Sequence, residues 1–296
     1  MKGFINKIQH YSTKDGPGIR STVFMVGCNL RCLWCCNPES MLPGYKLMYH
    51  SVKCQRCLSC AQAFPEAVTM SEQGCVINRE KADFDRLTDI CPFDAYEKMG
   101  EWIEAEELVS RLLRYREFYE GSRGGVTFSG GECLLQNEFV GECMDLLHEN
   151  GIEVCIDTAG NLPWDQIKGV LGRCDTVLFD LKAFDDDLHQ RLTSVSNKLI
   201  LENLSRLDQL GKELYIRMII VPGLNDDIND LKARVDRVRG LQSLRQIDFL
   251  KYHKLGVGKY RELGLRYPLE NIREVSEELL AEIREYAGDI VTTVGG

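Results

Sequence analysis

The 296-residue sequence has no long apolar run and no excess of basic residues. No stretch reaches the roughly 18 apolar residues of a membrane span, and Met1–Lys7 lacks the apolar core of a secretory signal. The formal net charge is -9 at pH 7, whereas a nucleic-acid partner would require a basic face. These absences predict a cytoplasmic protein whose partners are small molecules or other proteins, with no nucleic acid and no membrane.

Two further signatures are missing. The chain contains neither a G-x-G-x-x-G loop nor a P-loop lysine motif, so a common nucleotide site is not indicated. No cysteine follows Cys174, so the chain has no C-terminal cysteine cluster. Cysteine is otherwise abundant, with thirteen residues. In a cytoplasmic chain of this length, we interpret them as metal ligands and buried small residues, which fits a reducing, anaerobic cell.

Three thiols, Cys28, Cys32 and Cys35, follow the apolar run Thr22–Val26 closely. Their C-x3-C-x2-C spacing lets them reach one metal centre from a single loop. A 4Fe-4S cluster normally takes four thiolates, so three leave one iron open to something that is not protein. A zinc knuckle is the alternative, but zinc sites favour paired C-x2-C units and the first gap here is three residues. Spacing favours Cys35 over Cys36 as the third ligand.

A second run of thiols begins at Cys54, where the texture of the sequence changes. Bacterial ferredoxins use C-x2-C-x2-C-x3-C-P, and in two-cluster versions the fourth cysteine ligates the other cluster. Here Phe64 occupies the fourth position. The four remaining ligands for one closed, auxiliary 4Fe-4S cluster are Cys54, Cys57, Cys60 and Cys91. Zinc on the same thiols, or Cys75 in place of Cys91, are the alternatives. We predict that residues 49–100, called the insertion below, form a ferredoxin-like module.

From residue 101 onward, strand and helix patterns alternate. Counting the run before the first thiols, six strands are expected at Thr22–Val26, Val126–Phe128, Glu153–Ile156, Thr176–Phe179, Leu214–Val221 and Ile247–Leu250. A short opening strand is expected at 4–9, and helices at 104–119, 139–150, 199–210, 231–238 and 269–286, followed by a tail.

This alternation predicts an α/β fold with a parallel sheet and helices outside. Six units are too few for a closed eight-stranded barrel, so we expect a partial (β/α)6 TIM-like barrel formed by residues 1–48 and 101–296. Polar residues follow the strands, at Glu132, Asp157, Asp180, Lys182, Arg217 and His253. Active sites of barrels lie at the carboxyl ends of the strands, so these side chains should face one cleft.

Several short motifs stand beside the cysteine loop. They are D-G-P-G-I-R at 15–20, N-P-E at 37–39, S-G-G-E at 129–132, D-T at 157–158, D-L-K at 180–182, V-P-G at 221–223 and Y-H-K-L-G at 252–256. Together with the three thiols, over nearly the whole chain, they resemble the glycyl radical enzyme activating enzymes. This branch of the radical S-adenosylmethionine (SAM) superfamily includes the pyruvate formate-lyase activator. The chain departs from the family at two positions. Phe64 stands where the second run would have its fourth cysteine, and Cys133 stands where proline is common in the family.

The resemblance implies roles for individual residues. SAM would bind the open iron, with its amino group at Gly130, Gly131 and Glu132. Lys182 and His253 would hold its carboxylate and neighbouring atoms, and Arg217 would lie near the ribose. A monovalent cation beside SAM would be held by Asp157, Thr158 and Asp180. Asp15 would touch the glycine loop of the target protein. Cys133, Cys143, Cys155 and Cys174 are expected to be buried core residues.

The implied reaction begins when flavodoxin or ferredoxin reduces the three-thiol cluster, directly or through the insertion. SAM is then split to methionine and a 5'-deoxyadenosyl radical, which takes a hydrogen atom from a glycine of a larger glycyl radical enzyme. The protein itself is expected to be a monomer. Two alternatives are a radical SAM enzyme acting on a small molecule or peptide, which should lack the D-G-P-G-I-R loop, and an iron-sulfur electron carrier.

Overall fold

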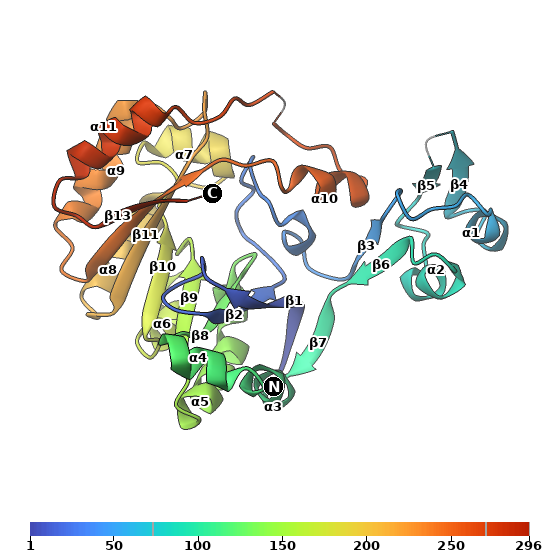
Figure 1. The fold of residues 1–296 in the computed structure, drawn as a ribbon, viewed down its shortest axis with the longest axis horizontal. Helices are drawn as coiled ribbons and strands as arrows, with labels where there is room; N and C mark the ends of the chain where they lie inside the picture. The colour runs from blue at the N-terminus through green and yellow to red at the C-terminus, as the bar shows by residue number, and fades with distance from the viewer. Residues whose placement is uncertain (73, 270, 296) are drawn as a thin grey trace.

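The computed structural model describes residues 1–72, 74–269 and 271–295. A central nine-stranded sheet has the order β13-β12-β11-β10-β9-β8-β2-β1-β7, and helices lie on its outer side (Figure 1). The strands from β2 to β13 are parallel to their neighbours, and β1 runs antiparallel to both β2 and β7. The predicted α/β fold around a mostly parallel sheet is confirmed.

The strands of this sheet are β1 (Lys2–Ser12), β2 (Arg20–Met25), β7 (Glu101–Glu104), β8 (Gly125–Gly130), β9 (Glu153–Thr158), β10 (Thr176–Asp180), β11 (Glu213–Ile220), β12 (Leu244–Lys251) and β13 (Thr292–Gly295). All six predicted parallel strands are present, most of them longer than predicted. The tail expected after the last helix instead contains β13, which pairs with β12 as a seventh parallel strand. β13 is only four residues long, and its sequence pattern is too short to predict a strand without the pairing to β12.

The helices of this part are α3 (Ala105–Leu113), α4 (Arg116–Ser122), α5 (Asn137–Glu149), α6 (Trp164–Leu171), α7 (Asp186–Thr193), α8 (Lys198–Asp208), α9 (Ile228–Arg239), α10 (Val257–Glu262) and α11 (Glu277–Ala287). Two single-turn 3-10 helices, η1 (Pro38–Ser40) and η2 (Cys133–Gln136), follow β2 and β8. The single helix predicted at 104–119 is therefore split in two. The helices α6, α7 and α10 were not predicted.

The last predicted helix, 269–286, is too long. In the structure α11 begins at Glu277, because the Ser276 hydroxyl accepts a hydrogen bond from the Leu279 N–H and caps the helix. Leu269 and Ile272 instead pack against a small hydrophobic cluster that includes Trp34. Apolar spacing alone could not distinguish these contacts from a helical face.

The side chains of β11 point alternately to the two faces of the sheet, one in the core and one at a cavity. Leu214, Ile216, Met218 and Ile220 are fully buried in the core beneath the helices. The intervening Tyr215 and Arg217 line a cavity on the other side of the strand. β12 repeats this arrangement, with Phe249 in the core and Asp248 at the cavity.

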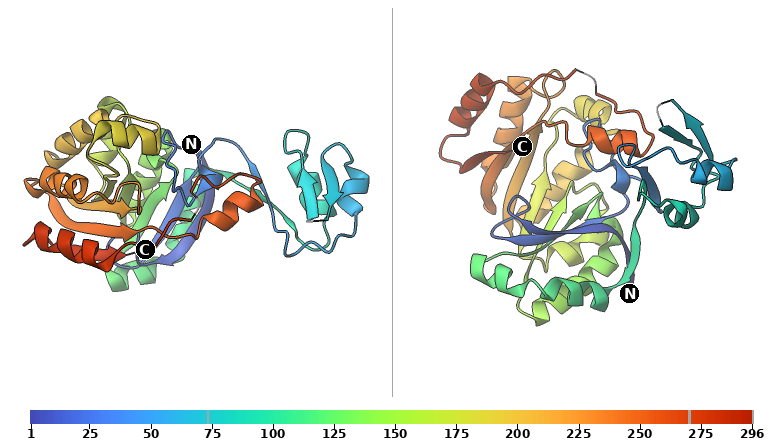
Figure 2. Two further views of the ribbon diagram at one scale, coloured as in Figure 1. Left: turned by 90° about the horizontal axis from the view of Figure 1, so that it is seen from above. Right: turned by 45° about the vertical axis from the view of Figure 1, so that its right-hand side comes forward.

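The chain between Lys46 and Met99 forms smaller elements apart from the large sheet (Figure 2). They are β3 (Lys46–Tyr49), α1 (Ser59–Ala63), β4 (Val68–Ser71), β5 (Gly74–Ile77), α2 (Phe84–Ile90) and β6 (Tyr96–Met99). β3 pairs with β6 and β4 with β5, both antiparallel. These elements share a hydrophobic cluster of their own, which includes Leu47, Val68 and Leu87. The predicted boundaries at 49 and 100 stay a prediction.

Helix α10 holds these smaller elements to the rest of the protein through side-chain hydrogen bonds. The Arg79 guanidinium donates to the Glu262 carbonyl at 2.8 Å, while its Nε donates to the Leu47 carbonyl at 3.1 Å. The ring nitrogens of His50 lie 2.8 Å from a Glu97 oxygen and 3.1 Å from a Glu262 oxygen. Within the three described ranges, no helix is long and apolar enough to cross a membrane.

The core position of Phe249 yields a stability prediction. Phe249→Ala should reduce the free energy of unfolding by about 3–5 kcal/mol, because it leaves a cavity beneath β12. Val291→Ala, at a residue that is 59% exposed near the same edge, should change it by less than about 0.5 kcal/mol. Urea unfolding followed by circular dichroism measures both, and equal losses would contradict the assignment of the core.

Candidate active site

A cavity of about 1090 Å³ opens at the carboxyl ends of the parallel strands. Its lining includes all thirteen residues predicted to hold the cluster, SAM or the cation or to touch the target's glycine loop: Asp15, Cys28, Cys32, Cys35, Gly130, Gly131, Glu132, Asp157, Thr158, Asp180, Lys182, Arg217 and His253. These residues come from seven separate stretches of the sequence. The fold therefore brings the predicted set together, as expected for residues that follow parallel strands.

The cysteine loop is held against α7. The Arg31 N–H donates to the Thr193 carbonyl at 2.7 Å, and the Leu33 N–H donates to the Leu192 carbonyl at 3.0 Å. The Cys28 sulfur in turn accepts a hydrogen bond from the Leu30 N–H at 3.4 Å. Backbone contacts thus fix the loop, so that its three thiols line one end of the cavity.

Burial raises the pKa of the Cys28 and Cys35 thiols and raises that of Cys32 to about 11. The thiols are therefore protonated near neutral pH and must lose their protons when they bind a metal. Among the described residues, no three His, Cys, Asp or Glu side chains gather around a point as a single-ion site would require.

The S-G-G-E turn lies directly against the start of the cysteine loop. The Gly131 N–H donates to the Met25 carbonyl at 2.9 Å, and the Glu132 N–H donates to the Gly27 carbonyl at 2.7 Å. A Cβ on Gly131 would lie 2.1 Å from the Gly27 oxygen, and a Cβ on Gly130, where φ is +109°, would lie 2.3 Å from the Met25 nitrogen. The two glycines are therefore required for this backbone contact.

Glu132 lines the cavity, but its carboxylate is also tied to the protein. One oxygen accepts from the Leu134 N–H at 3.2 Å and from the Thr158 hydroxyl at 2.8 Å, and the other accepts from the Ala159 N–H at 3.1 Å. Burial raises the pKa of Glu132 to about 7. The carboxylate joins the ends of β8 and β9, in addition to any contact with a ligand.

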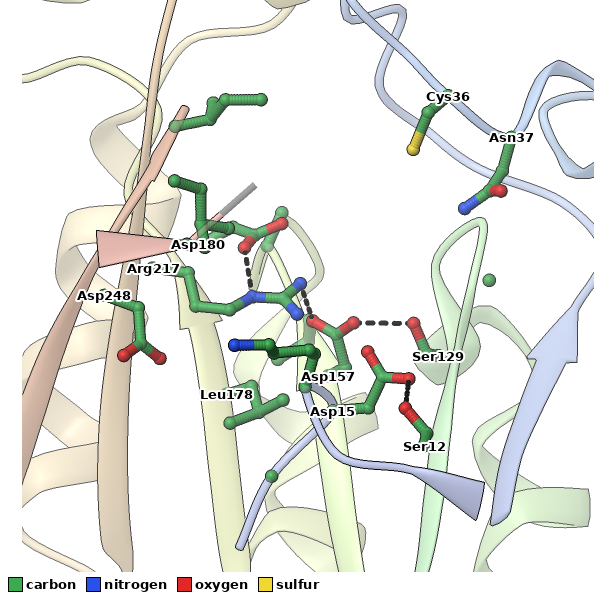
Figure 3. Close-up of a pocket in the computed structure, with 18 of the residues that line it drawn as sticks. Ser12, Asp15, Cys36, Asn37, Ser129, Asp157, Leu178, Asp180, Arg217 and Asp248 are labelled. Carbon is green, nitrogen blue, oxygen red and sulfur yellow. Dashed lines mark hydrogen bonds and ion pairs between the residues drawn. The ribbon is translucent and has the colours of Figure 1, made fainter. Parts of the chain in front are cut away.

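An ionic network spans the ends of β9, β10 and β11 (Figure 3). The Arg217 guanidinium donates to Asp157 at 2.6 Å and to Asp180 at 3.0 Å. The Lys182 ammonium donates to the second Asp180 oxygen at 2.8 Å, and the Ser129 hydroxyl donates to Asp157 at 2.6 Å. Register explains the pairing, because Arg217 stands directly beside Asp180 on the neighbouring strand.

The environment sets the charges of this network. Burial raises the pKa of Asp157 to about 6 despite the nearby Arg217. Burial opposes the ionisation of Asp180 too, but Arg217 and Lys182 together lower its pKa below its ordinary value. Burial likewise opposes the charge on Lys182, yet Asp180 raises the pKa of the ammonium. Near neutral pH this network therefore holds two cations, Arg217 and Lys182, against two carboxylates.

The D-G-P-G-I-R loop reaches the same cavity through Asp15. Its carboxylate accepts from the Ser12 hydroxyl at 2.5 Å and from the Thr22 hydroxyl at 2.7 Å. Arg20 behaves differently, because it is fully buried and donates to the Thr127 hydroxyl at 2.8 Å and to backbone carbonyls. Arg20 thus fixes the loop to the sheet and adds no charge to the cavity lining.

Other polar residues near the cavity were not predicted. Lys259 on α10 donates to Asn37 at 2.9 Å and to the buried Glu39 carboxylate at 2.6 Å. At the far wall, Asp248 accepts a hydrogen bond from Thr293 on β13. The buried Nδ1 of His253 has no hydrogen-bond partner within the described part of the chain. No local pattern marks Lys259 or Thr293, because each depends on contacts with distant segments.

The thiols of the insertion lie away from this cavity. Cys60 belongs to the small hydrophobic cluster, and Cys54, Cys75 and Cys91 pack against it, whereas Cys57 is exposed. The sulfurs of Cys60 and Cys75 are 3.8 Å apart. Elsewhere the four cysteines expected in the core, Cys133, Cys143, Cys155 and Cys174, are fully buried as predicted.

A family model described as the radical SAM superfamily matches residues 22–235. A radical SAM methyltransferase from Sphaerobacter thermophilus shares the fold, with a TM-score of 0.56 and 15% identity over 98% of this chain and 76% of its own. The chain belongs to the radical SAM superfamily.

Relatives within the superfamily place the chain more closely. The choline trimethylamine-lyase activating enzyme of Oleidesulfovibrio alaskensis is 37% identical over 96% of both chains. The trans-4-hydroxy-L-proline dehydratase activating enzyme of Clostridioides difficile is 35% identical over 100% of both. The pyruvate formate-lyase 2-activating enzyme of Escherichia coli is 32% identical over 99% of this chain and 92% of its own. The protein is a glycyl radical enzyme activating enzyme, which cleaves SAM and abstracts hydrogen from a glycine of its partner.

The contact at Gly131 yields the second prediction. Gly131→Ala should destabilise the protein by about 1–3 kcal/mol and weaken SAM binding, because its methyl group would push the cysteine loop away. Gly169→Ala, on the exposed side of α6 with open space around it, should stabilise by up to about 1 kcal/mol. Thermal unfolding and equilibrium dialysis with labelled SAM measure the two effects, and unaltered SAM binding in Gly131→Ala would argue against the contact.

Proposed function

We propose that the cavity binds SAM on a 4Fe-4S cluster held by Cys28, Cys32 and Cys35. The observation that supports this most strongly is that the three thiols share one cavity with the S-G-G-E turn and the Arg217 network. The donor set fits the cluster, because three thiolates leave one iron free. When bound, the cluster and SAM supply an electron and a carbon radical, while the protein supplies orientation and exclusion of water.

Roles for the remaining residues follow from their positions. Gly130 and Gly131 form a turn beside the cysteine loop, where they and Glu132 can receive the amino group of SAM. Lys182 offers a cation to the SAM carboxylate, and the unpartnered Nδ1 of His253 offers a further polar contact. Arg217 lies deeper in the cavity, where it can contact the ribose.

A monovalent cation beside SAM is a further proposal, with Asp157, Thr158 and Asp180 as its ligands. They lie together at the ends of β9 and β10, and Thr158 stands beside Phe179, the residue before Asp180. All four carboxylate oxygens already accept hydrogen bonds. The cation would therefore share these oxygens with Arg217 and Lys182.

The partner is a glycyl radical enzyme, and we propose that Asp15 contacts its glycine loop. Asp15 lines the cavity, and the Ser12 and Thr22 hydroxyls orient its carboxylate. The names of relatives at 29–37% identity give several different partners. Overall identity thus supports the class of partner and no single member of it.

The choice between neighbouring thiols yields the third prediction. Cys35→Ala should reduce the formation of 5'-deoxyadenosine from SAM to background, because the cluster loses one of three ligands. Cys36→Ala is the matched control, since Cys36 lines the same cavity outside the C-x3-C-x2-C spacing, and it should retain cleavage. Chromatography of the reaction with dithionite as reductant gives the result. Cleavage that survives in Cys35→Ala but not in Cys36→Ala would reassign the third ligand.

We further propose that the large sheet is a partial barrel and that residues 49–100 are a ferredoxin-like module with one auxiliary 4Fe-4S cluster on Cys54, Cys57, Cys60 and Cys91. Counting back from Cys91-Pro92 with the ferredoxin spacing places the other cluster's ligands at Leu87, Phe84 and Lys81. Leu87 is fully buried in the hydrophobic cluster of the insertion, and Phe84 and Phe64 pack against that hydrophobic cluster. Apolar packing thus occupies the region where a second auxiliary cluster would be.

Iron content gives the fourth prediction. The reconstituted wild-type protein should hold about eight irons per chain, and Cys57→Ala about four, because only the auxiliary cluster is lost. Cys91→Ser should behave as Cys57→Ala, whereas Cys75→Ser should keep the wild-type iron content. Colorimetric iron and sulfide analysis measures this. Loss of iron in Cys75→Ser but not in Cys91→Ser would make Cys75 the fourth ligand, and an unchanged count in Cys57→Ala would remove the cluster.

The supply of electrons and the working state complete the proposal. We infer that flavodoxin or ferredoxin donates the electron and that the activating enzyme acts as a monomer toward its larger partner. We also place it in the cytoplasm, because its thirteen cysteines are all free thiols in the described structure, which requires a reducing compartment.

A further inference from the structure

We propose that Tyr49 and Tyr96 donate hydrogen bonds to cysteine sulfurs of the auxiliary cluster and thereby raise its reduction potential. This inference rests on the proposed auxiliary cluster. It assigns to two tyrosines the control of how readily that cluster accepts an electron.

The two tyrosines form one unit of the insertion. They stand directly opposite each other in the antiparallel pair of β3 and β6, and their ring centroids are 5.5 Å apart. Tyr49 is 8% exposed and Tyr96 is 5% exposed. Both belong to the hydrophobic cluster against which the thiols pack. The sheet therefore directs two phenol groups from one face into the region of the sulfurs.

Both hydroxyls meet sulfur atoms there. The Tyr96 hydroxyl donates to the Cys60 sulfur at 3.2 Å, and the Cys75 thiol is a second neighbour. The Tyr49 oxygen accepts a hydrogen bond from the Cys75 N–H at 3.1 Å, which leaves its own proton to donate. Burial and, after it, the neighbouring Cys54 thiol raise the pKa of the Tyr49 hydroxyl. Two predicted ligands, Cys54 and Cys60, thus each have a phenol neighbour.

Buried hydroxyls need a hydrogen-bond partner, and a phenol has a single proton to donate. A thiolate bound to iron carries more negative charge than a thiol and is the stronger acceptor. Metal binding at Cys54 and Cys60 therefore strengthens the contacts that the structure already contains. These contacts do not depend on whether Cys91 or Cys75 is the fourth ligand.

The effect on the potential has a definite sign. Reduction adds one negative charge to the cluster and its thiolates, so hydrogen bonds to sulfur stabilise the reduced form more than the oxidised form. Hydrogen bonds to the sulfurs are among the factors that set the potential of an iron-sulfur cluster. Tyr49 and Tyr96 should accordingly make the auxiliary cluster easier to reduce. The external donor would then reduce the auxiliary cluster early.

The location of the pair gives this effect a use. β3 and β6 are the strands through which the chain enters and leaves the insertion, and Arg79 ties the Leu47 carbonyl of β3 to α10. α10 in turn contacts the segment after the cysteine loop through Lys259 and Glu39. The phenols therefore act on the cluster at the side of the insertion that joins the catalytic cavity.

The test is a redox titration monitored by electron paramagnetic resonance, on the full chain carrying Cys32→Ala so that the auxiliary cluster is observed alone. Tyr96→Phe and Tyr49→Phe should each shift its midpoint to a more negative potential with unchanged iron content, and the double variant should shift it further. Tyr45→Phe is the matched control, because Tyr45 is 40% exposed and its ring contacts Phe4 and Lys98. It should leave the midpoint unchanged.

A second readout applies where only one of the two phenylalanine variants keeps its cluster. In protein exchanged into D2O, the iron-thiolate stretching bands of the resonance Raman spectrum should shift, and the shift should shrink in whichever phenylalanine variant retains iron. Midpoints equal to that of the Tyr45→Phe control, or bands insensitive to D2O, would overturn the inference while leaving the cluster in place. If the Cys32→Ala protein holds no iron at all, the auxiliary cluster itself is wrong and the inference falls with it.

Discussion

The candidate site depends first on the partly buried guanidinium of Arg217. It joins Asp157 on β9 to Asp180 on β10, and Lys182 balances the remaining charge of Asp180. Neutralising Asp180 would remove the carboxylate that Arg217 and Lys182 share, whereas neutralising Asp157 would leave Arg217 paired with Asp180 alone. The network therefore stabilises the ends of three neighbouring strands and lines the cavity with charged groups of both signs. Any ligand with a carboxylate must enter this arrangement and compete for the same cations.

A second constraint is the backbone contact between the S-G-G-E turn and the cysteine loop. Because Gly131 brings its backbone against the Gly27 carbonyl, the end of β8 holds the first residues after β2 in place. The other side of the loop is held by α7. The three thiols are thus positioned by hydrogen bonds between backbone groups, which do not depend on the metal.

The insertion is stabilised separately from the large sheet. It has its own small core, in which Phe64 and Leu87 lie where the ferredoxin spacing would place ligands. Tyr96 donates to the Cys60 sulfur, and Tyr49 accepts from the Cys75 N–H. The connection through α10 keeps this core in contact with the catalytic part of the protein.

The sequence by itself determined the thiol loop, the alternation of strands and helices, and the polar residues that end the strands, because these depend on spacing and period within a short stretch. It also determined that all these residues face one cavity, since parallel strands end on the same side. Tertiary structure alone decided which of them touch. Arg217 meets Asp180 through strand register, β13 forms only because β12 is beside it, and Leu269 packs on Trp34 instead of extending a helix. Tyr49 meets Tyr96 across a sheet whose strands are separated by most of the insertion. Such contacts join residues far apart in the chain, and no local pattern records them.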